Sequence, residues 1–207
     1  MQVTVVANPK GGVGKSTLAT NLAGFFARRG ESVMLGDVDR QQSARDWLAL
    51  RPAELPPIAG WEIDRNAPAR PPKGTTQAVL DTPAGLHGKL LAKTLRVATR
   101  VVIPLQPSLF DILATRHFLD ALVEERAFRK GQLAVGVVAM RVDPRTRAAA
   151  ELDRFLAQTE VPVVAHIRST QLYVQLAARG LTLFDVNPNP VAQDLEQWDS
   201  LIRWLDS

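Results

Sequence analysis

The stretch that most constrains the fold of this chain lies at residues 3–17, which read VTVVANPKGGVGKST. The opening VTVV is rich in β-branched residues and predicts a short buried strand. Three glycines then fall within four positions, and GKST opens an amphipathic helix. A strand, a glycine-rich loop, GK[ST] and a helix in this order predict a phosphate-binding loop. A glycine-rich turn that only joins strand to helix is the alternative, but it does not account for all four features together.

The residues of this loop have a definite chemistry. Glycine lacks a Cβ, so the backbone can take positive φ and turn successive N–H groups toward phosphate oxygens. The N-terminus of the following helix adds partial positive charge. Lys15 is predicted to reach the β- and γ-phosphates, and the Ser16 hydroxyl is predicted to ligate Mg²⁺.

The loop departs from the common GxxxxGK[ST] pattern at two places. Pro9 stands where that pattern has its first glycine, and a second lysine, Lys10, precedes the glycines. KGGVGKST resembles the deviant P-loop of the ParA/MinD family of ATPases, in which the extra lysine reaches across a two-fold axis to the partner subunit's nucleotide. The resemblance implies a homodimer enclosing two ATP molecules, with Lys10 acting in trans. It implies nucleotide contacts from Lys10, Gly11, Gly12, Val13, Gly14, Lys15, Ser16 and Thr17.

Acidic residues follow two further predicted strands. Residues 32–36 lead into DVDRQQ, and residues 76–80 lead into DTPAG. In a parallel α/β sheet, ligands bind outside the carboxyl ends of the strands. We expect Asp81 to bind Mg²⁺ directly or through water, Asp37 to support the metal shell, and Asp39 to orient the attacking water. A solvated acidic turn is the alternative for the first motif.

The two acidic motifs match the family to different degrees. DTPAG closely matches the family's version of the second motif. The family's usual first motif is DxDPQ, and Arg40 replaces its proline here. In the family an asparagine often ends a later strand and frames the adenine, but Met140 stands at that place. Met140 and the turn around Pro188 are the candidates for contacts with the base.

The remaining pattern predicts one α/β domain over residues 1–207. Further strands are expected at 99–105, 133–140 and 161–167, and helices at 41–50, 86–97, 109–127, 148–158 and 191–205. The proline-rich residues 51–76 read as a surface segment with a strand at 58–63 and with Arg51, Arg65, Arg70 and Lys73. Alternating strands and helices predict a three-layer P-loop NTPase fold, a mostly parallel twisted sheet covered by helices on both faces.

Composition excludes some functions. The 207 residues contain no cysteine, which removes disulfides, thiolate metal sites and iron–sulfur clusters. The sequence shows neither a signal peptide nor an apolar run long enough to cross a bilayer, so a cytoplasmic protein is expected. A formal charge of +4 permits weak association with nucleic acid.

The resemblance extends to biological use. The chain starts directly with the P-loop strand, as short ParA-type proteins without an N-terminal helix-turn-helix do. Such proteins bind DNA non-specifically as ATP dimers, on the nucleoid, and release it when a ParB-like partner stimulates hydrolysis. The cargo is a plasmid, a chromosome region or a protein cluster. DNA contacts are expected from Arg145, Arg147, Arg168 and Arg179, although each alone could be a solvated arginine.

Two other functions are known for folds of this kind. A MinD-like membrane-cycling ATPase would use a basic amphipathic terminal helix, but residues 191–205 and the following Asp206 carry Asp194, Glu196, Asp199 and Asp206 against Arg203. Core packing of that helix is therefore expected, and a membrane partner is not. The fold could also serve a metabolic enzyme or a tyrosine kinase that phosphorylates its own tail. Tyr173 is the only tyrosine, which disfavours the kinase.

Overall fold

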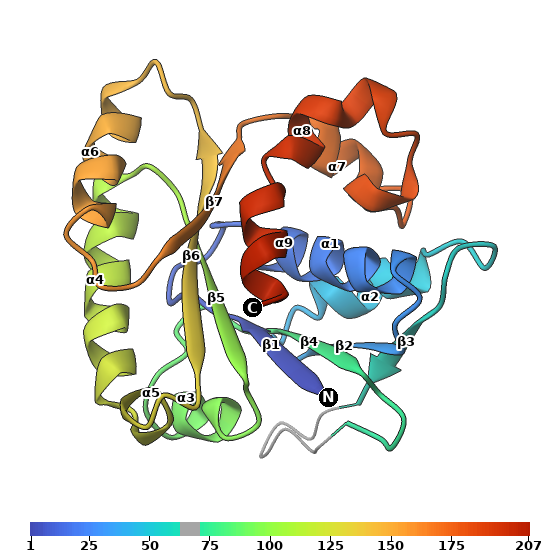
Figure 1. The fold of residues 1–207 in the computed structure, drawn as a ribbon, viewed down its shortest axis with the longest axis horizontal. Coiled ribbons are helices and arrows are strands. Elements are labelled where there is room, and N and C mark those ends of the chain that lie inside the picture. Colours follow the sequence, from blue (N-terminus) through green and yellow to red (C-terminus); the bar gives the residue numbers. More distant parts are fainter. Residues whose placement is uncertain (63–70) are drawn as a thin grey trace.

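The structure, a computed structural model, describes residues 1–62 and 71–207 and is built on one sheet. The sheet has seven strands in the order β3-β2-β4-β1-β5-β6-β7, and all neighbouring pairs are parallel (Figure 1). The strands are β1 (Gln2–Val6), β2 (Val33–Asp37), β3 (Ile58–Trp61), β4 (Gln77–Asp81), β5 (Arg100–Leu105), β6 (Ala134–Val142) and β7 (Val163–Arg168). The expected parallel sheet is confirmed.

Helices cover both faces of the sheet and make three layers (Figure 1). The helices are α1 (Lys15–Arg28), α2 (Ser43–Ala49), α3 (Gly88–Leu95), α4 (Leu109–Glu124), α5 (Arg126–Arg129), α6 (Arg147–Leu156), α7 (Leu172–Ala177), α8 (Ala192–Glu196) and α9 (Asp199–Leu205), with 3₁₀ turns at Leu183–Asp185 and Asn189–Val191. One core lies between the sheet and α1, α2, α7 and α9, and the other between the sheet and α3, α4 and α6. Alternate strand residues supply the two cores, as a sheet buried on both faces requires.

The terminal helix predicted at residues 191–205 is interrupted. It comprises a 3₁₀ turn, α8 and α9, with a break at Trp198, whose indole Nε1 donates to the Tyr173 hydroxyl over 2.9 Å. Trp198 and Leu205 are buried, so the expected core packing is confirmed. Asp194, expected on the polar side, is instead 2% exposed and accepts two hydrogen bonds from Arg168. None of the helices in the described part of the chain combines the length and apolarity needed to span a bilayer.

Two other expectations need correction. The helix predicted at 109–127 ends at Glu124, because Glu125 takes an extended backbone, and α5 then starts anew. Arg51, expected at the surface, has a side chain only 5% exposed, and it pairs with Asp185, whose side chain is fully buried. Its guanidinium donates to both oxygens of Asp185 and to the Pro56 carbonyl, so the cation is buried with its hydrogen bonds satisfied.

The segment that follows α2 is described only in part. The strand predicted at 58–63 is present as β3, from Ile58 to Trp61. Its predicted end at Ile63 lies outside the described residues, as do Arg65 and Arg70.

Candidate nucleotide-binding site

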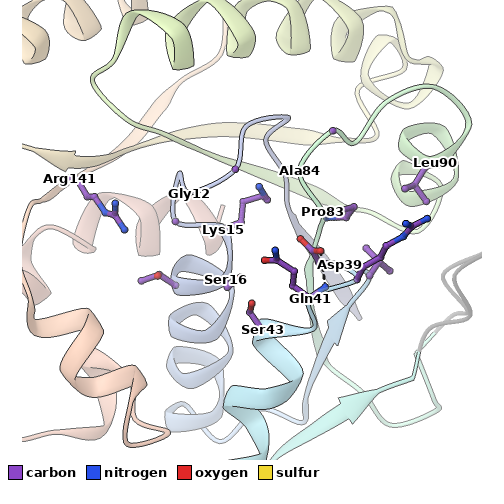
Figure 2. Close-up of a pocket in the computed structure, with 16 residues that line it drawn as sticks. Gly12, Lys15, Ser16, Asp39, Gln41, Ser43, Pro83, Ala84, Leu90 and Arg141 are labelled. Carbon is purple, nitrogen blue, oxygen red and sulfur yellow. Dashed lines mark hydrogen bonds between the residues drawn. The ribbon is translucent and has the colours of Figure 1, made fainter.

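An open cleft of about 890 Å³ lies at the carboxyl ends of the central strands (Figure 2). Val6, Asp37 and Asp81 end β1, β2 and β4 at the same level, because Asp81 is paired in register with both others. The cleft is lined by Gly11, Gly12, Gly14, Lys15, Ser16, Thr17, Val38, Asp39, Arg40, Gln41, Ser43, Pro83, Ala84, Gly85, Leu90 and Arg141. Most of the predicted phosphate loop therefore faces one cavity, at the sheet edge where α/β folds bind ligands.

Two glycines give the loop its shape. Gly12 has φ +77° and Gly14 has φ +97°, values that side chains with a Cβ adopt at a cost. Gly14 is the N-cap of α1, and no side chain caps the helix there. The first N–H groups of α1 are therefore left for a ligand, which is the arrangement that binds phosphate.

Residues distant in sequence hold the loop in place. The buried side chain of Asn8 donates to the Pro104 carbonyl over 2.8 Å and to the Thr115 hydroxyl over 2.9 Å. Its Oδ1 accepts from the Lys10 N–H over 2.9 Å. Gln106 donates to the Gly12 carbonyl over 2.8 Å. These contacts were not expected from the sequence, since nothing local distinguishes Asn8 or Gln106 from ordinary loop residues.

Lys15 is nearly buried at the centre of the loop. Its side chain is folded back so that Nζ donates to the Lys10 carbonyl over 2.7 Å, and the residue is 7% exposed. Burial lowers the pKa of Lys15, while the carboxylates of Asp81 and Asp39 act to raise it. The lysine therefore lies at the floor of the cleft, where a phosphate would satisfy its charge.

Asp81 fits the predicted divalent metal site. It is 1% exposed, and its Oδ1 has no hydrogen-bond partner among the described residues. Burial raises the pKa of Asp81 to about 7, against the lowering effects of the Ser16 hydroxyl and the Lys15 cation. A buried carboxylate beside a hydroxyl suits a hard cation such as Mg²⁺, which takes oxygen ligands.

No ready-made metal cage surrounds Asp81. The described residues contain no group of three or more His, Cys, Asp or Glu side chains placed to hold a metal. Ser16 and Asp81 would supply only part of an octahedral shell. This suits Mg²⁺, which usually completes its shell with waters and substrate phosphates.

The two aspartates after β2 have different surroundings. Asp39 lines the cleft, and its Oδ1 accepts from the Gln41 N–H over 3.1 Å (Figure 2). Asp37 turns toward α2 and accepts from the N–H groups of Asp39, Ala44 and Arg45. Asp37 was expected to support the metal shell. In the structure both oxygens accept from backbone donors and the side chain does not line the cleft, so support of the metal shell by Asp37 stays a prediction.

Lys10 is placed differently from Lys15. Its backbone N–H and carbonyl bond to Asn8 and to Lys15 Nζ, so its main chain is fixed within the loop. Among the described residues that line the cleft, Lys10 is missing while Gly11 and Gly12 are present. Action of Lys10 on a partner's nucleotide stays a prediction, and this geometry leaves the side chain outside its own cleft.

The two candidate base contacts are not among the described residues that line the cleft, and their contact with the base stays a prediction. Met140 is 4% exposed, and its Cε lies 3.0 Å from where a Cβ on Gly14 would stand. It therefore packs beneath the phosphate loop. Pro188 is exposed and does not line the cleft. The neighbour of Met140, Arg141, lines the cleft instead, which the sequence did not indicate.

The four candidate DNA-binding arginines fall into two pairs. Arg145 bonds to both oxygens of Asp143 at 2.9 Å, and Arg168 bonds to both oxygens of Asp194 at 2.7 and 2.9 Å. Arg147, at the start of α6, and Arg179, after α7, are exposed. Neither of these two forms an ion pair within the described chain. Of the set, Arg147 and Arg179 are the freer to meet a phosphate, and all four remain predictions.

Comparisons with known proteins identify the family of this chain. The family model of the CobQ/CobB/MinD/ParA nucleotide binding domain matches residues 4–183. The chain is 33% identical over 192 residues to maintenance of carboxysome distribution protein A of Gloeobacter kilaueensis, covering 88% of this chain and 83% of that protein. It is 29% identical over 181 residues to the chromosome-partitioning ATPase Soj of Thermus thermophilus, covering 72% of each.

A solved structure shows the same fold. The putative plasmid partition protein of Borrelia burgdorferi bound to AMPPNP superposes with a TM-score of 0.73 at 16% identity, covering 98% of both chains. The match of the family model across the phosphate loop, both acidic motifs and most of the sheet establishes the relationship. This chain belongs to the CobQ/CobB/MinD/ParA family of nucleotide-binding domains, within which its relatives include ParA-type positioning and partition ATPases.

Proposed function

We propose that this chain is a Mg²⁺-dependent ATPase that dimerises on binding ATP, binds DNA non-specifically as the ATP dimer, and so positions or segregates a cargo. Hydrolysis, slow in the chain alone, would be stimulated by a ParB-like partner. The observation that carries the proposal is the different position of the two loop lysines. Lys15 lies in the cleft, and Lys10 lies outside it. The relatives that act in chromosome partitioning and carboxysome distribution support a positioning role.

The residues of the cleft suit phosphoryl transfer to water. Loop N–H groups and Lys15 would hold the phosphates, and Ser16 and Asp81 would hold Mg²⁺. The metal, when bound, supplies charge neutralisation on the phosphate oxygens. Asp39 would orient a water in line with the γ-phosphorus, so that the new P–O bond forms as the bond to the β–γ bridging oxygen breaks and ADP leaves.

Replacement of Asp39 tests this assignment. Asp39→Ala is expected to lower phosphate release by about 100-fold, because a positioned carboxylate contributes about that much to a proton-coupled attack. ATP binding should be retained, so the ATP dimer should persist on DNA. Steady-state phosphate release and DNA retention after ATP is diluted measure the two effects. Asp46→Ala, on the exposed side of α2, is the control. Hydrolysis at the parent rate in Asp39→Ala would refute the role.

DNA retention at increasing salt tests the proposed use of the dimer. Retention is expected with ATP and Mg²⁺ and not with ADP or without nucleotide, and it should fall linearly with salt on logarithmic axes. Arg147→Ala and Arg179→Ala should each reduce the salt slope by about one. Arg203→Ala, which removes an exposed arginine bonded to Ser200, is the control. Equal retention with and without ATP would reject the DNA function.

The structure gives less support to a membrane-cycling ATPase and to a tyrosine kinase that phosphorylates its own tail. The apolar stripe expected of a membrane helix is buried in the core at Val191, Trp198 and Leu205. Tyr173 is 8% exposed and accepts the Trp198 hydrogen bond, so it is poorly placed to be a phosphorylation target.

A further inference from the structure

Arg40 is an exposed cation on the wall of the nucleotide cleft. It lies between Asp39 and Gln41 in the chain, and all three residues line the same cavity as Lys15. In the part of the chain that the structure describes, the Arg40 guanidinium takes part in no hydrogen bond, ion pair or ring contact. An exposed side chain without a partner changes rotamer freely. Arg40 is therefore available to an anion that enters the cleft.

The backbone at Arg40 forms a tight turn that another residue type would suit better. The Gln42 N–H donates to the Asp39 carbonyl over 3.3 Å, so Arg40 and Gln41 are the two central residues of a β-turn. Neither has a positive φ, as in type I turns, whose second position favours proline. The usual form of this motif has proline there, and the Arg40 N–H makes no hydrogen bond with the described residues that a proline would remove. The turn therefore does not need an arginine, which leaves the side chain as the reason for this residue.

The side of the cleft that holds Asp39 has an excess of negative charge once a triphosphate is bound. Figure 2 shows Asp39 on one side of Lys15 and Arg141 on the other. The carboxylates of Asp39 and Asp81 both lie close enough to Lys15 to raise its pKa, so both would also repel a terminal phosphate bound to that lysine. Mg²⁺ and Lys15 together carry fewer positive charges than these carboxylates and the β- and γ-phosphates carry negative ones. Of the cations that line the cleft in the described chain, Arg40 is the one next to Asp39.

We propose that Arg40 is a further catalytic residue, which binds the γ-phosphate in its own cleft and stabilises the charge on the phosphate oxygens during transfer. As the water oxygen bonds to the γ-phosphorus, the bond to the β–γ bridging oxygen breaks and ADP leaves with that electron pair. The guanidinium donates N–H groups to the γ-oxygens and keeps its own proton throughout. An arginine suits this role because it is always charged and its planar donors match two phosphate oxygens. The inference rests on the proposed ATPase function.

The test compares ADP with ADP plus aluminium fluoride, each with Mg²⁺, by calorimetry, because aluminium fluoride stands in for the transferring phosphoryl group. Arg40→Ala is expected to weaken binding of the aluminium fluoride complex by about tenfold and to leave ADP binding unchanged, since ADP has no γ-phosphate. The kcat for phosphate release should fall by about tenfold, because the contact is strongest in the transition state. Arg45→Ala is the matched control, since it removes an exposed arginine of α2 that does not line the cleft. Unchanged binding of the aluminium fluoride complex, or equal weakening of both ligands, would overturn the proposal.

A proline variant separates the side chain from the turn. Arg40→Pro should melt at the parent temperature or above without nucleotide, because proline fixes the φ that a type I turn needs at this position. Its kcat should nevertheless fall as far as that of Arg40→Ala. A lower melting temperature would show that the arginine stabilises the turn itself, which contradicts the reason for assigning its side chain to the cleft. Hydrolysis at the parent rate by the folded proline variant would also overturn the proposal.

Three other results separate this inference from the proposed ATPase function. Weaker ATP-dependent dimerisation of Arg40→Ala, measured by sedimentation, with unchanged binding of the aluminium fluoride complex would assign Arg40 to the partner subunit and reject the proposal. Normal hydrolysis by both the parent and Arg40→Ala would reject the role of Arg40 alone. A parent that binds ADP but releases no phosphate from ATP would reject the ATPase function, and the role of Arg40 with it.

Discussion

Lys15→Ala is expected to raise the dissociation constant for ATP by about 100-fold or more, which removes binding at ordinary concentrations. The residue is 7% exposed at the floor of the cleft, between the loop carbonyl of Lys10 and the carboxylates of Asp81 and Asp39. A charge-assisted bond to phosphate in such a site contributes about 1.5–3 kcal/mol, and the unneutralised carboxylates would then also repel the phosphates. Calorimetric titration with ATP and Mg²⁺ measures the loss.

Folding of the Lys15 variant must be checked separately. The free protein should melt within a few degrees of the parent, because removal of a nearly buried cation offsets the lost hydrogen bond to Lys10. The parent should gain thermal stability when ATP is added, and Lys15→Ala should not, since only a bound ligand stabilises the native state. Lys130→Ala, on an exposed lysine beyond α5, should behave as the parent. An ATP-dependent stabilisation of Lys15→Ala equal to that of the parent would refute the assignment.

The phosphate loop and the sheet could be predicted because their signals are local. Glycines at positions that require positive φ, as at Gly12 and Gly14, are visible in the sequence itself. Short β-branched runs separated by helical patterns likewise imply a parallel sheet. Asp81 follows such a run directly, so its place at the sheet edge needed only the strand assignment.

Other site features depend on contacts between distant residues. Asn8 supports the loop through Thr115, which lies 107 positions away, and no local pattern links the two. Asp37 and Asp39 look alike in the sequence. Only the position of α2 decides that Asp37 accepts its N–H groups while Asp39 faces the cleft. Arg141 lines the cleft beside a β-bulge that arises from pairing with β7, and this bulge is equally invisible in β6 alone.

The sequence analysis placed Asp194 and Arg51 at the surface because it relied on residue type alone, and both predictions were wrong. Asp194 lies three residues after Val191 and four before Trp198, so helical geometry places it on the buried side of that stripe. It was expected to face water because it is an aspartate. The bidentate bond from Arg168 makes its burial possible, just as Asp185 makes possible the burial of Arg51. Both ion pairs join segments that are far apart in the chain, so the sequence around one residue does not indicate which residue pairs with it.

Lys10→Ala is expected to separate ATP binding from dimerisation. Only the backbone of Lys10 takes part in the loop, through its N–H to Asn8 and its carbonyl to Lys15, and an alanine keeps both groups. The variant should therefore bind ATP with nearly the parent affinity. If the side chain acts on the partner's nucleotide, its loss removes a charge-assisted bond from each half of a symmetric dimer. Two such bonds together contribute about 3–6 kcal/mol, so the dimer dissociation constant should rise by about 100-fold or more.

Sedimentation of the Lys10 variant with ATP, in a background of Asp39→Ala to slow hydrolysis, measures that constant. Lys10→Arg is the informative companion, because it keeps the charge and changes the geometry of a bond that spans two chains. A normal ATP-dependent dimer in Lys10→Ala would refute action in trans. Loss of ATP binding in the monomer would instead assign Lys10 to its own cleft. A parent protein that stays monomeric with ATP would reject the dimer itself. The substitutions change only the side chain at position 10, so each result reports on that side chain. The Lys10 side chain lies outside the cleft, and its presence distinguishes this loop from an ordinary phosphate-binding loop.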